Sequence, residues 1–437
     1  MEKRGKIDVS DEIEADIDST VTSVTNYIEK RYQESFISPK QYCDTLLFIT
    51  EVYKVDREKK VLKEIGYDMC RGIKHEIERE MLRNPISMIE GIGYAAFSVH
   101  AFSCTTGLLN NFSSQLDEHL LDMAYGMAPR YISNNEPTKV ESYDCILGIS
   151  GATYYLLDIF DVGNKKISTC LEYLINLTTL TEIDGKFVPK FHVKSSEQIT
   201  KEAQEIFKNG NINFGVSHGM MGPLLTLSKA LNMGWKVNGL NVGVRRLFDI
   251  YERYRISKGN ISFWPGVLPL ELYLNADYDY KWIHFPASWC YGNISIVRGL
   301  QKVAKVLKYK EKEEFYYNEM NKILSRNITE LLLDSPALCH GYSGILMLRL
   351  IFLRDYKAEY DLDLLEENIR IIIEKFRKNS EIVKQEPNII FKHTYRGKRI
   401  EGYMNDLSLL NGSVGIALTL QNVKTEQMIY NKLLMMD

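Results

Sequence analysis

The sequence predicts an all-α protein, built as a closed, double-layered ring of helical hairpins. Apolar segments of helical length recur along the chain, and six of them open with a Gly-x-Gly or Gly-x-x-Gly pair, in which serine once replaces the second glycine. A more polar helical segment follows each of them. Apolar helices need an outer covering layer, and an open array would need polar caps at both ends, so we expect the array to close on itself. A linear solenoid is the alternative.

Before the repeat begins, the chain predicts three helices. Apolar residues recur at three- and four-residue steps from Asp11 to Tyr32, which is typical of an amphipathic helix. Two further segments, Lys40 to Tyr53 and Lys59 to Arg83, are rich in good helix formers, and Pro39 marks the start of the first.

The glycine pairs then mark the starts of the apolar helices. Glycine at a helix start lets backbones approach closely and leaves N–H groups open, so the six starts should gather at one face of the ring. Their first glycines are separated by 57, 71, 73, 49 and 71 residues, and each interval accommodates a helical hairpin with its loops. These glycines are Gly91, Gly148, Gly219, Gly292, Gly341 and Gly412.

One segment, residues 181–214, interrupts this rhythm. Its Asp184-Gly185 pair precedes alternating apolar residues, a pattern typical of a β-hairpin. We therefore expect a small inserted segment with a β-hairpin on a single helical domain of residues 1–437. Residues 388–400 have a similar strand-like pattern.

The bulk composition limits the classes of function. Among 437 residues, 25% are charged and the net charge is −3, so we expect no nucleic-acid partner. The seven cysteines lack CxxC spacing and the N-terminus lacks an apolar signal region, which predicts a reduced, cytoplasmic protein. The chain has no run of about 18 apolar residues, so we expect no transmembrane segment. Peripheral contact with a membrane is a possibility that this pattern leaves open.

Two thiols and an imidazole stand just before two of the glycine-opened helices. Cys290 lies in Trp-Cys-Tyr-Gly, and Cys339 and His340 lie in Leu-Cys-His-Gly. Cysteine and histidine are ligands that zinc prefers, and three protein ligands leave a fourth position open for water or substrate. Adjacent helical residues point about 100° apart, so Cys339 and His340 can reach one metal only from a loop. The alternative is a buried structural cysteine beside a core histidine.

The chain resembles the lanthionine synthetase C-like cyclases over roughly residues 85 to 420. The motifs that carry the resemblance are Ser217-His218-Gly219, Trp289-Cys290-Tyr291-Gly292 and Cys339-His340-Gly341, in this order and within the glycine repeat. Two positions depart from the family pattern. Pro286 stands where an arginine is usual, which puts an active-site arginine in doubt, and Ser295 replaces a glycine.

The resemblance implies an α/α toroid with one zinc ion per chain, held by Cys290, Cys339 and His340. It implies an enzyme that adds peptide cysteine thiols to dehydroalanine or dehydrobutyrine, giving lanthionine or methyllanthionine thioether rings. The implied substrate is a dehydrated precursor peptide with its leader. A lanthipeptide dehydratase and an ABC exporter are the further candidate partners, in a biosynthetic complex at the membrane.

The resemblance also implies acid–base or electrostatic roles for Asp144 and His218. The reaction must deliver a proton to the α-carbon, and a histidine with an ordinary pKa near 6.5 suits this task, so His218 is our candidate donor. Asp144 could remove the thiol proton, orient His218 or cap a helix. Tyr291 could hydrogen-bond the enolate or pack.

The alternative function is a non-catalytic scaffold that binds peptide and carries a structural zinc. A structural zinc normally has four protein ligands, and Cys145, next to Asp144, would be the candidate fourth. A sugar hydrolase would need paired carboxylates, and Asp144 alone is suitably placed. The remaining histidines, His284 among them, lack a comparable sequence context and receive no chemical role.

Overall fold

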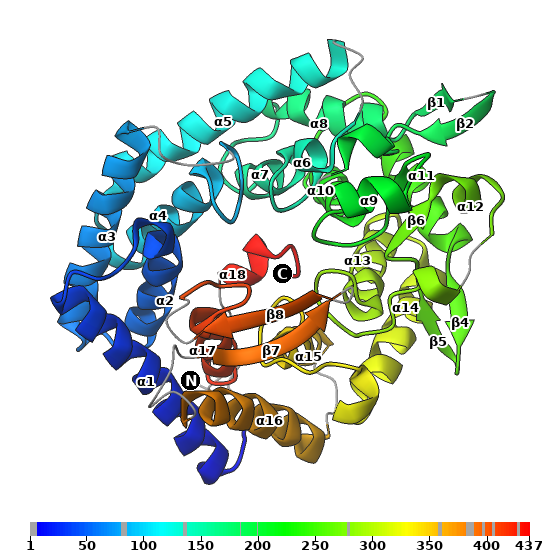
Figure 1. The fold of residues 1–437 in the computed structure, drawn as a ribbon. Helices are drawn as coiled ribbons and strands as arrows, with labels where there is room; N and C mark the ends of the chain where they lie inside the picture. The colour runs from blue at the N-terminus through cyan, green and yellow to red at the C-terminus, as the bar shows by residue number, and fades with distance from the viewer. Residues whose placement is uncertain are drawn as a thin grey trace.

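The computed structural model has two concentric layers of helices arranged as a ring (Figure 1). The helices are joined by loops and a few short strands. The structure describes residues 7–79, 85–133, 138–183, 185–198, 200–277, 280–356, 361–381, 389–395, 398–403, 407–425 and 429–437.

The inner layer consists of helices whose residues are largely buried. Six of them begin within two residues of a first glycine of the repeat, as the sequence predicts. At Gly151 a Cβ atom would lie 2.0 Å from the Cys145 carbonyl oxygen, which shows how closely backbones approach at these starts. The six helices are α4 (Ile92–Thr106), α7 (Ile149–Leu156), α10 (Met221–Asn232), α13 (Asn293–Val306), α15 (Tyr342–Tyr356) and α17 (Ser413–Gln421).

A further inner helix, α2 (Tyr42–Val55), is not marked by the glycine pattern. It follows the short 3₁₀ turn η1 (Pro39–Gln41), and its residues from Asp44 to Val52 are all buried. It packs against α4 and α17, so it belongs to the inner layer without a glycine start.

The outer layer consists of amphipathic helices that bury one face against the inner layer. The first of them buries Ile13, Ile17, Val24 and Ile28 at the predicted spacing, and full burial of such a side chain contributes about 1.5–3 kcal/mol. The third predicted helix ends at Glu78, and residues 80–83 of the prediction lie outside the described residues. The outer helices are α1 (Asp11–Gln33), α3 (Lys60–Glu78), α5 (Asn110–Ser133), α8 (Lys165–Leu177), α11 (Leu240–Arg253), α14 (Lys310–Leu324) and α16 (Leu362–Glu381).

Contacts between the two ends of the chain close the ring. Helix α1 packs against α16 and α17. Arg377 Nη2 donates to Asp16 Oδ1 at 2.7 Å, and Lys424 Nζ donates to Asp18 Oδ1 at 2.6 Å. The prediction of an α/α toroid is therefore confirmed, and the linear solenoid is excluded.

Short strand pairs lie at one side of the ring and on its face. In the predicted insertion, β1 (Leu180–Ile183) and β2 (Lys186–Pro189) form an antiparallel hairpin around Gly185 with φ +76°; Asp184 lies outside the described residues. The segment continues through η2 (Ser195–Glu197) and α9 (Lys201–Ile206) to β3 (Asn211–Asn213), which pairs with β6 (Val267–Pro269). Strand β6 has no signal in the sequence, and its pairing with β3 connects the inserted segment to the body of the ring. The other strand pairs are β4 (Ile256–Lys258) with β5 (Ile261–Phe263), and β7 (Ile389–Tyr395) with β8 (Lys398–Tyr403).

The last residues of the chain lie in the middle of the ring (Figure 1). The carbonyl oxygen of Leu434 accepts from Trp289 Nε1 at 3.2 Å, and the side chain of Asp437 accepts from the Tyr154 hydroxyl at 2.6 Å. The remaining short helices are α6 (Val140–Tyr143), α12 (Leu270–Leu274), α18 (Tyr430–Leu433), η3 (Tyr280–Trp282) and η4 (Ile328–Leu331). Among the described helices, none has the length and apolar character needed to cross a bilayer.

Candidate metal centre

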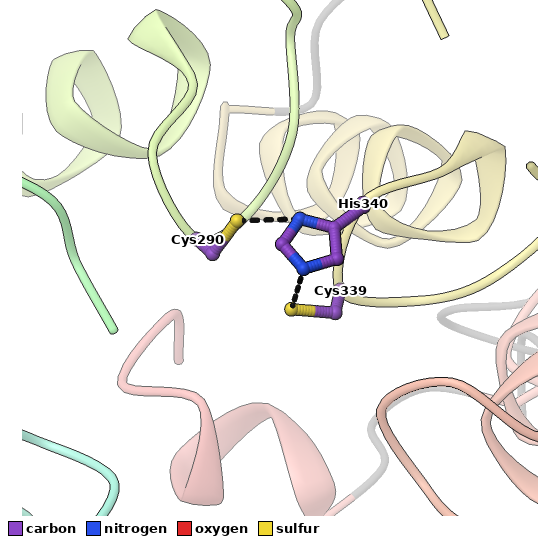
Figure 2. Close-up of side chains that lie close together, drawn as sticks. All are labelled: Cys290, Cys339 and His340. Atoms are coloured by element: carbon purple, nitrogen blue, oxygen red, sulfur yellow. Dashed lines mark hydrogen bonds between the residues drawn. The ribbon is translucent and has the colours of Figure 1, made fainter. Parts of the chain in front are cut away.

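The three predicted metal ligands meet at one face of the ring. Cys290 lies in the loop before α13, and Cys339 and His340 lie in the loop before α15. The Cys290 Sγ is 2.8 Å from His340 Nδ1, and the Cys339 Sγ is 3.3 Å from His340 Nε2. Figure 2 shows the imidazole between the two thiols, and one ligand atom from each residue lies within 4.8 Å of the others. Residues 49 positions apart in sequence thus form one cluster.

Tight loops hold these ligands in place. A Cβ at Gly292 would lie 2.2 Å from the Ser288 carbonyl oxygen, and a Cβ at Gly341 would lie 2.1 Å from that of Ser335, so each ligand loop folds back on itself where only glycine fits. The Cys290 carbonyl oxygen accepts from Val216 N at 2.8 Å, in the loop that carries His218. The Cys290 loop and the His218 loop are therefore fixed relative to one another.

The electrostatics of the cluster favour a thiolate at Cys290. Burial raises the pKa of this thiol, but the hydrogen bond from Cys339 and the charge of the adjacent His340 outweigh burial and lower the pKa well below its ordinary value. The hydrogen bond to Cys290, together with burial, raises the pKa of Cys339 instead. Since a metal binds the thiolate form, one ligand is already held in the form that a metal requires.

The donor set fits a zinc ion. Two cysteine sulfurs and one imidazole nitrogen are ligands of the kind found in zinc sites, and sulfur and nitrogen ligands of one tetrahedral zinc lie roughly 3.5 Å apart. The two observed contacts run to different ring nitrogens, 3.3 Å from Cys339 Sγ to Nε2 and 2.8 Å from Cys290 Sγ to Nδ1. One imidazole nitrogen binds a given zinc, so only one of these contacts can be a ligand–ligand distance, while one ligand atom from each of the three residues lies within 4.8 Å of the others. The two cysteines are 1% and 6% exposed, so a metal here would be shielded from bulk water.

Among the described residues, Cys145 is not part of the cluster formed by Cys290, Cys339 and His340. It is fully buried, and its Sγ donates to the Ser217 carbonyl oxygen at 3.3 Å. The three-ligand set opens instead into a cavity of about 320 Å³. This arrangement favours a site with an open coordination position over a closed structural one.

Asp144 orients His218, as considered from the sequence, but the prediction of a helix N-cap is wrong, because α7 has Gly148 as its N-cap and no side-chain cap hydrogen bond. Its Oδ1 accepts from the backbone N–H groups of Ile146, Leu147 and Gly148 at 3.0, 2.5 and 3.0 Å, in the loop that precedes α7. Its Oδ2 accepts from His218 Nδ1 at 2.6 Å. The carboxylate is fully buried with both oxygens engaged, so it is better placed to orient His218 than to remove a substrate proton.

We expect Asp144→Ala to destabilise the protein through the loop before α7. The three backbone N–H groups would lose their acceptor in a buried site, which costs about 1–3 kcal/mol of the free energy of unfolding. Asp144→Asn retains an acceptor oxygen and should cost less. Urea unfolding of the two variants beside the wild type measures this difference. An unchanged free energy of unfolding in Asp144→Ala would show that these three hydrogen bonds contribute nothing.

His218 is oriented by its hydrogen bond to Asp144. The Asp144 carboxylate accepts a hydrogen bond from Nδ1–H, which leaves Nε2 as the nitrogen able to exchange protons. Burial alone would lower the pKa of His218, but the hydrogen bond and the charge of Asp144 raise it above its ordinary value. The side chain is 34% exposed and lines the same cavity as the three metal ligands.

Tyr291 also lines this cavity. Its hydroxyl accepts from Asn213 Nδ2 at 3.1 Å, and its ring packs on Gly215, where a Cβ would lie 2.5 Å from the ring. Tyr291 therefore packs against Gly215 and also forms a hydrogen bond within the protein. A hydrogen bond from Tyr291 to an enolate stays a prediction.

Two features of the site were missed by sequence reasoning. His284 Nε2 lies 3.2 Å from Ser288 Oγ, which in turn lies 3.5 Å from the Cys290 Sγ. The charge of His284 contributes to the low pKa of Cys290. The signal in the sequence was the closeness of His284 to Pro286, where the family pattern has an arginine. The second feature is a wall of the cavity built by the predicted insertion, including Gln198 and Phe207.

Comparison with known proteins identifies the fold and the family of the chain. A solved structure of nisin cyclase superposes with a TM-score of 0.73 at 18% identity, covering 95% of this chain and 97% of that chain. The curated relative "Nisin biosynthesis protein NisC" of Lactococcus lactis subsp. lactis is 24% identical over 255 residues, which are 58% of this chain and 57% of that protein, so the match spans little more than half of the relative's length. The family model described as "Lanthionine synthetase C-like protein" matches residues 42–433. The chain thus belongs to the lanthionine synthetase C-like protein family.

Proposed function

We propose that this protein is a zinc-dependent lanthipeptide cyclase. Its reaction is the addition of cysteine thiols of a dehydrated precursor peptide to dehydroalanine or dehydrobutyrine, which forms lanthionine and methyllanthionine rings. The observation that carries the proposal is the shared cavity, in which the Cys290, Cys339 and His340 cluster lies beside the hydrogen-bonded pair His218 and Asp144.

Cys290, Cys339 and His340 would hold the zinc ion. Zinc bound there would favour ionisation of a thiol that takes its open coordination position. A thiol with a pKa of about 8.5 is a few per cent ionised at pH 7, so full ionisation gains at most about thirtyfold, or about 2 kcal/mol. Holding thiol and alkene together in the cavity can contribute roughly 7–11 kcal/mol, which makes positioning the larger effect.

His218 would complete the addition. The thiol loses its proton, its sulfur forms a bond to the β-carbon, and the α-carbon takes up a proton from Nε2 of the protonated imidazole. The proton lost by the thiol balances the one gained by the α-carbon, so no atom leaves the peptide. Asp144 would keep the imidazole in the correct tautomer and raise the population of its protonated form, while Tyr291 would hydrogen-bond the enolate oxygen.

In the pH profile of kcat/KM, we expect a descending alkaline limb with an apparent pKa above 6.5. The donor loses its proton as the pH rises through the pKa of His218, which the Asp144 interaction raises. Asp144→Asn removes the charge that raises this pKa, so the descending limb should move to lower pH. Rates of cyclisation over pH 5 to about 9 measure the shift. A descending limb at the same pH in wild type and Asp144→Asn would contradict the role of His218.

The direct test is incubation of the purified protein with a dehydrated precursor peptide that carries its leader. Alkylation of remaining thiols and mass spectrometry then count the cysteines consumed. We expect loss of alkylatable thiols without a change in peptide mass, since the addition is an isomerisation. Binding of the peptide without thiol consumption would favour the non-catalytic scaffold.

The substrate chemistry implies the proposed partners. A dehydratase must first convert serine and threonine of the precursor into the alkenes that the cyclase consumes, and an exporter would take the product. We place this complex in the cytoplasm at the inner side of the membrane.

A further inference from the structure

Two polar side chains lie beside the Cys290 thiol but outside the cavity of the metal centre. Ser288 Oγ is 3.5 Å from the Cys290 Sγ, and His284 Nε2 is 3.2 Å from the same serine oxygen. Of these three residues, the described lining of the cavity includes Cys290 alone. A molecule in the cavity would contact the cysteine, whereas Ser288 and His284 can influence such a molecule only through the sulfur.

The backbone fixes the position of Ser288. Its N–H donates to the Pro286 carbonyl oxygen at 2.9 Å, and its own carbonyl oxygen accepts from Gly292 N at 2.8 Å, within the tight turn that carries Cys290. The residue is 2% exposed, so bulk water does not compete for its hydroxyl. This hydroxyl therefore has the Cys290 sulfur and the His284 imidazole as partners.

His284 is held by the segment that leads into β6. Its backbone N–H donates to the Trp264 carbonyl oxygen at 3.3 Å, and its neighbour Ile283 forms an antiparallel bridge with Pro265. Its side chain starts over Gly266, where a Cβ would lie 3.5 Å from the His284 Cβ. The position of the imidazole thus depends on a segment outside the turn that carries the metal ligand.

The number of available protons fixes the direction of both hydrogen bonds when the sulfur binds a metal. A metal-bound cysteine is a thiolate, so it can only accept. Ser288 has one hydroxyl proton, and with this proton directed at the sulfur its oxygen can only accept from His284. His284 Nε2 must then carry a proton, as it does in one neutral tautomer and in the imidazolium. Two hydrogen bonds in series therefore end on the Cys290 sulfur.

The geometry points to His284 as a positioning residue of the metal centre, which acts through Ser288 on the Cys290 thiolate. This inference rests on the zinc site of the proposed function. A hydrogen bond to a buried thiolate offsets part of its charge and holds its direction, and partners that orient metal ligands in this way contribute about 10- to 100-fold to metal affinity. Linked hydrogen bonds polarise one another, so loss of His284 should weaken the bond from Ser288.

The zinc affinity of the full-length protein, measured by competition with a chromophoric chelator, tests this role. Ser288→Ala removes the donor to the sulfur and should weaken zinc binding about 10- to 100-fold, and His284→Leu should weaken it about 10-fold. His284→Gln keeps an N–H donor close to the position of Nε2 and should bind zinc as the wild type does. The matched control is Ser343→Ala, because the buried Ser343 hydroxyl donates to the Pro336 carbonyl oxygen at 2.6 Å. This control should also keep the wild-type affinity.

The double variant separates the proposed series of hydrogen bonds from two independent structural effects. If His284 acts through Ser288, His284→Leu should cause no further loss of zinc affinity in a protein that already carries Ser288→Ala. Independent effects would add instead. Additive losses, or wild-type affinity in either single variant, would overturn the proposal.

A spectroscopic measurement reports on the sulfur itself. In protein loaded with Co²⁺, the sulfur-to-cobalt charge-transfer band should move to longer wavelength in Ser288→Ala and in His284→Leu, because a thiolate that loses a hydrogen bond gives up an electron more easily. A loosened fold would lower the affinity without this shift, so an unshifted band would contradict the proposal. Circular dichroism shows whether Ser288→Ala is folded, and if it is not, His284→Leu beside His284→Gln decides.

Both measurements use the metal alone and do not depend on cyclisation. A wild-type protein that binds zinc but does not cyclise the peptide would overturn the proposed function and leave the role of His284 intact. An active protein whose zinc affinity and cobalt spectrum are unchanged in His284→Leu would overturn the role of His284 alone. A wild-type protein that binds no zinc would overturn both.

Discussion

Cys290→Ala is expected to abolish zinc binding and thioether formation together. The variant leaves two of the three proposed ligands, and it removes the thiol whose pKa the site lowers for metal binding. The zinc content of the purified protein, measured by elemental analysis, should fall from one zinc per chain to nearly none. In the peptide assay, cyclisation should fall to the rate of the uncatalysed reaction.

Cys170→Ala is the matched control for this experiment. Cys170 is as deeply buried as Cys290, but it lies in α8, and burial raises its pKa to about 12. Its loss should leave zinc content and activity unchanged. Full zinc occupancy in Cys290→Ala would show that the ligands are assigned wrongly, and an active wild-type protein free of metal would remove zinc from the mechanism.

His218→Asn should retain zinc and slow cyclisation by about 10²- to 10⁴-fold, the usual contribution of a positioned acid or base. Asparagine keeps a side chain able to hydrogen-bond Asp144, but it cannot deliver a proton at neutral pH. The measurement is the rate of thiol consumption under single-turnover conditions, with zinc content determined on the same preparation.

His192→Asn separates this effect from a general loss of histidine. His192 is buried in the inserted segment, where its Nε2 contacts the Asn209 carbonyl oxygen at 2.9 Å, and it does not line the cavity of the metal centre. It should leave the rate within a few-fold of the wild type. If His218→Asn loses zinc and activity to the same extent, His218 supports the metal site and is not the proton donor.

Local patterns in the sequence were sufficient for the fold class. Glycine pairs and three- to four-residue apolar spacing depend on neighbours within a turn or two of helix, so they mark helix starts and buried faces wherever the helices later pack. They failed where the local signal was absent. Helix α2 lacks a glycine start, and the three-residue strands β3 and β6 are too short for an alternating pattern, yet they pair across more than fifty residues.

The candidate site shows the same division. The sequence by itself determined which residues to consider, because the Cys290 and Cys339-His340 motifs stand before glycine-opened helices. The tertiary structure alone decided their relations: the hydrogen bond from His218 to Asp144 across 74 residues, the contact of His284 with Ser288 beside Cys290, and the cavity wall built by the insertion. Closure of the ring brings these loops together, and the distances between side chains on different loops depend on the packing of the helices beneath them, which no local pattern records.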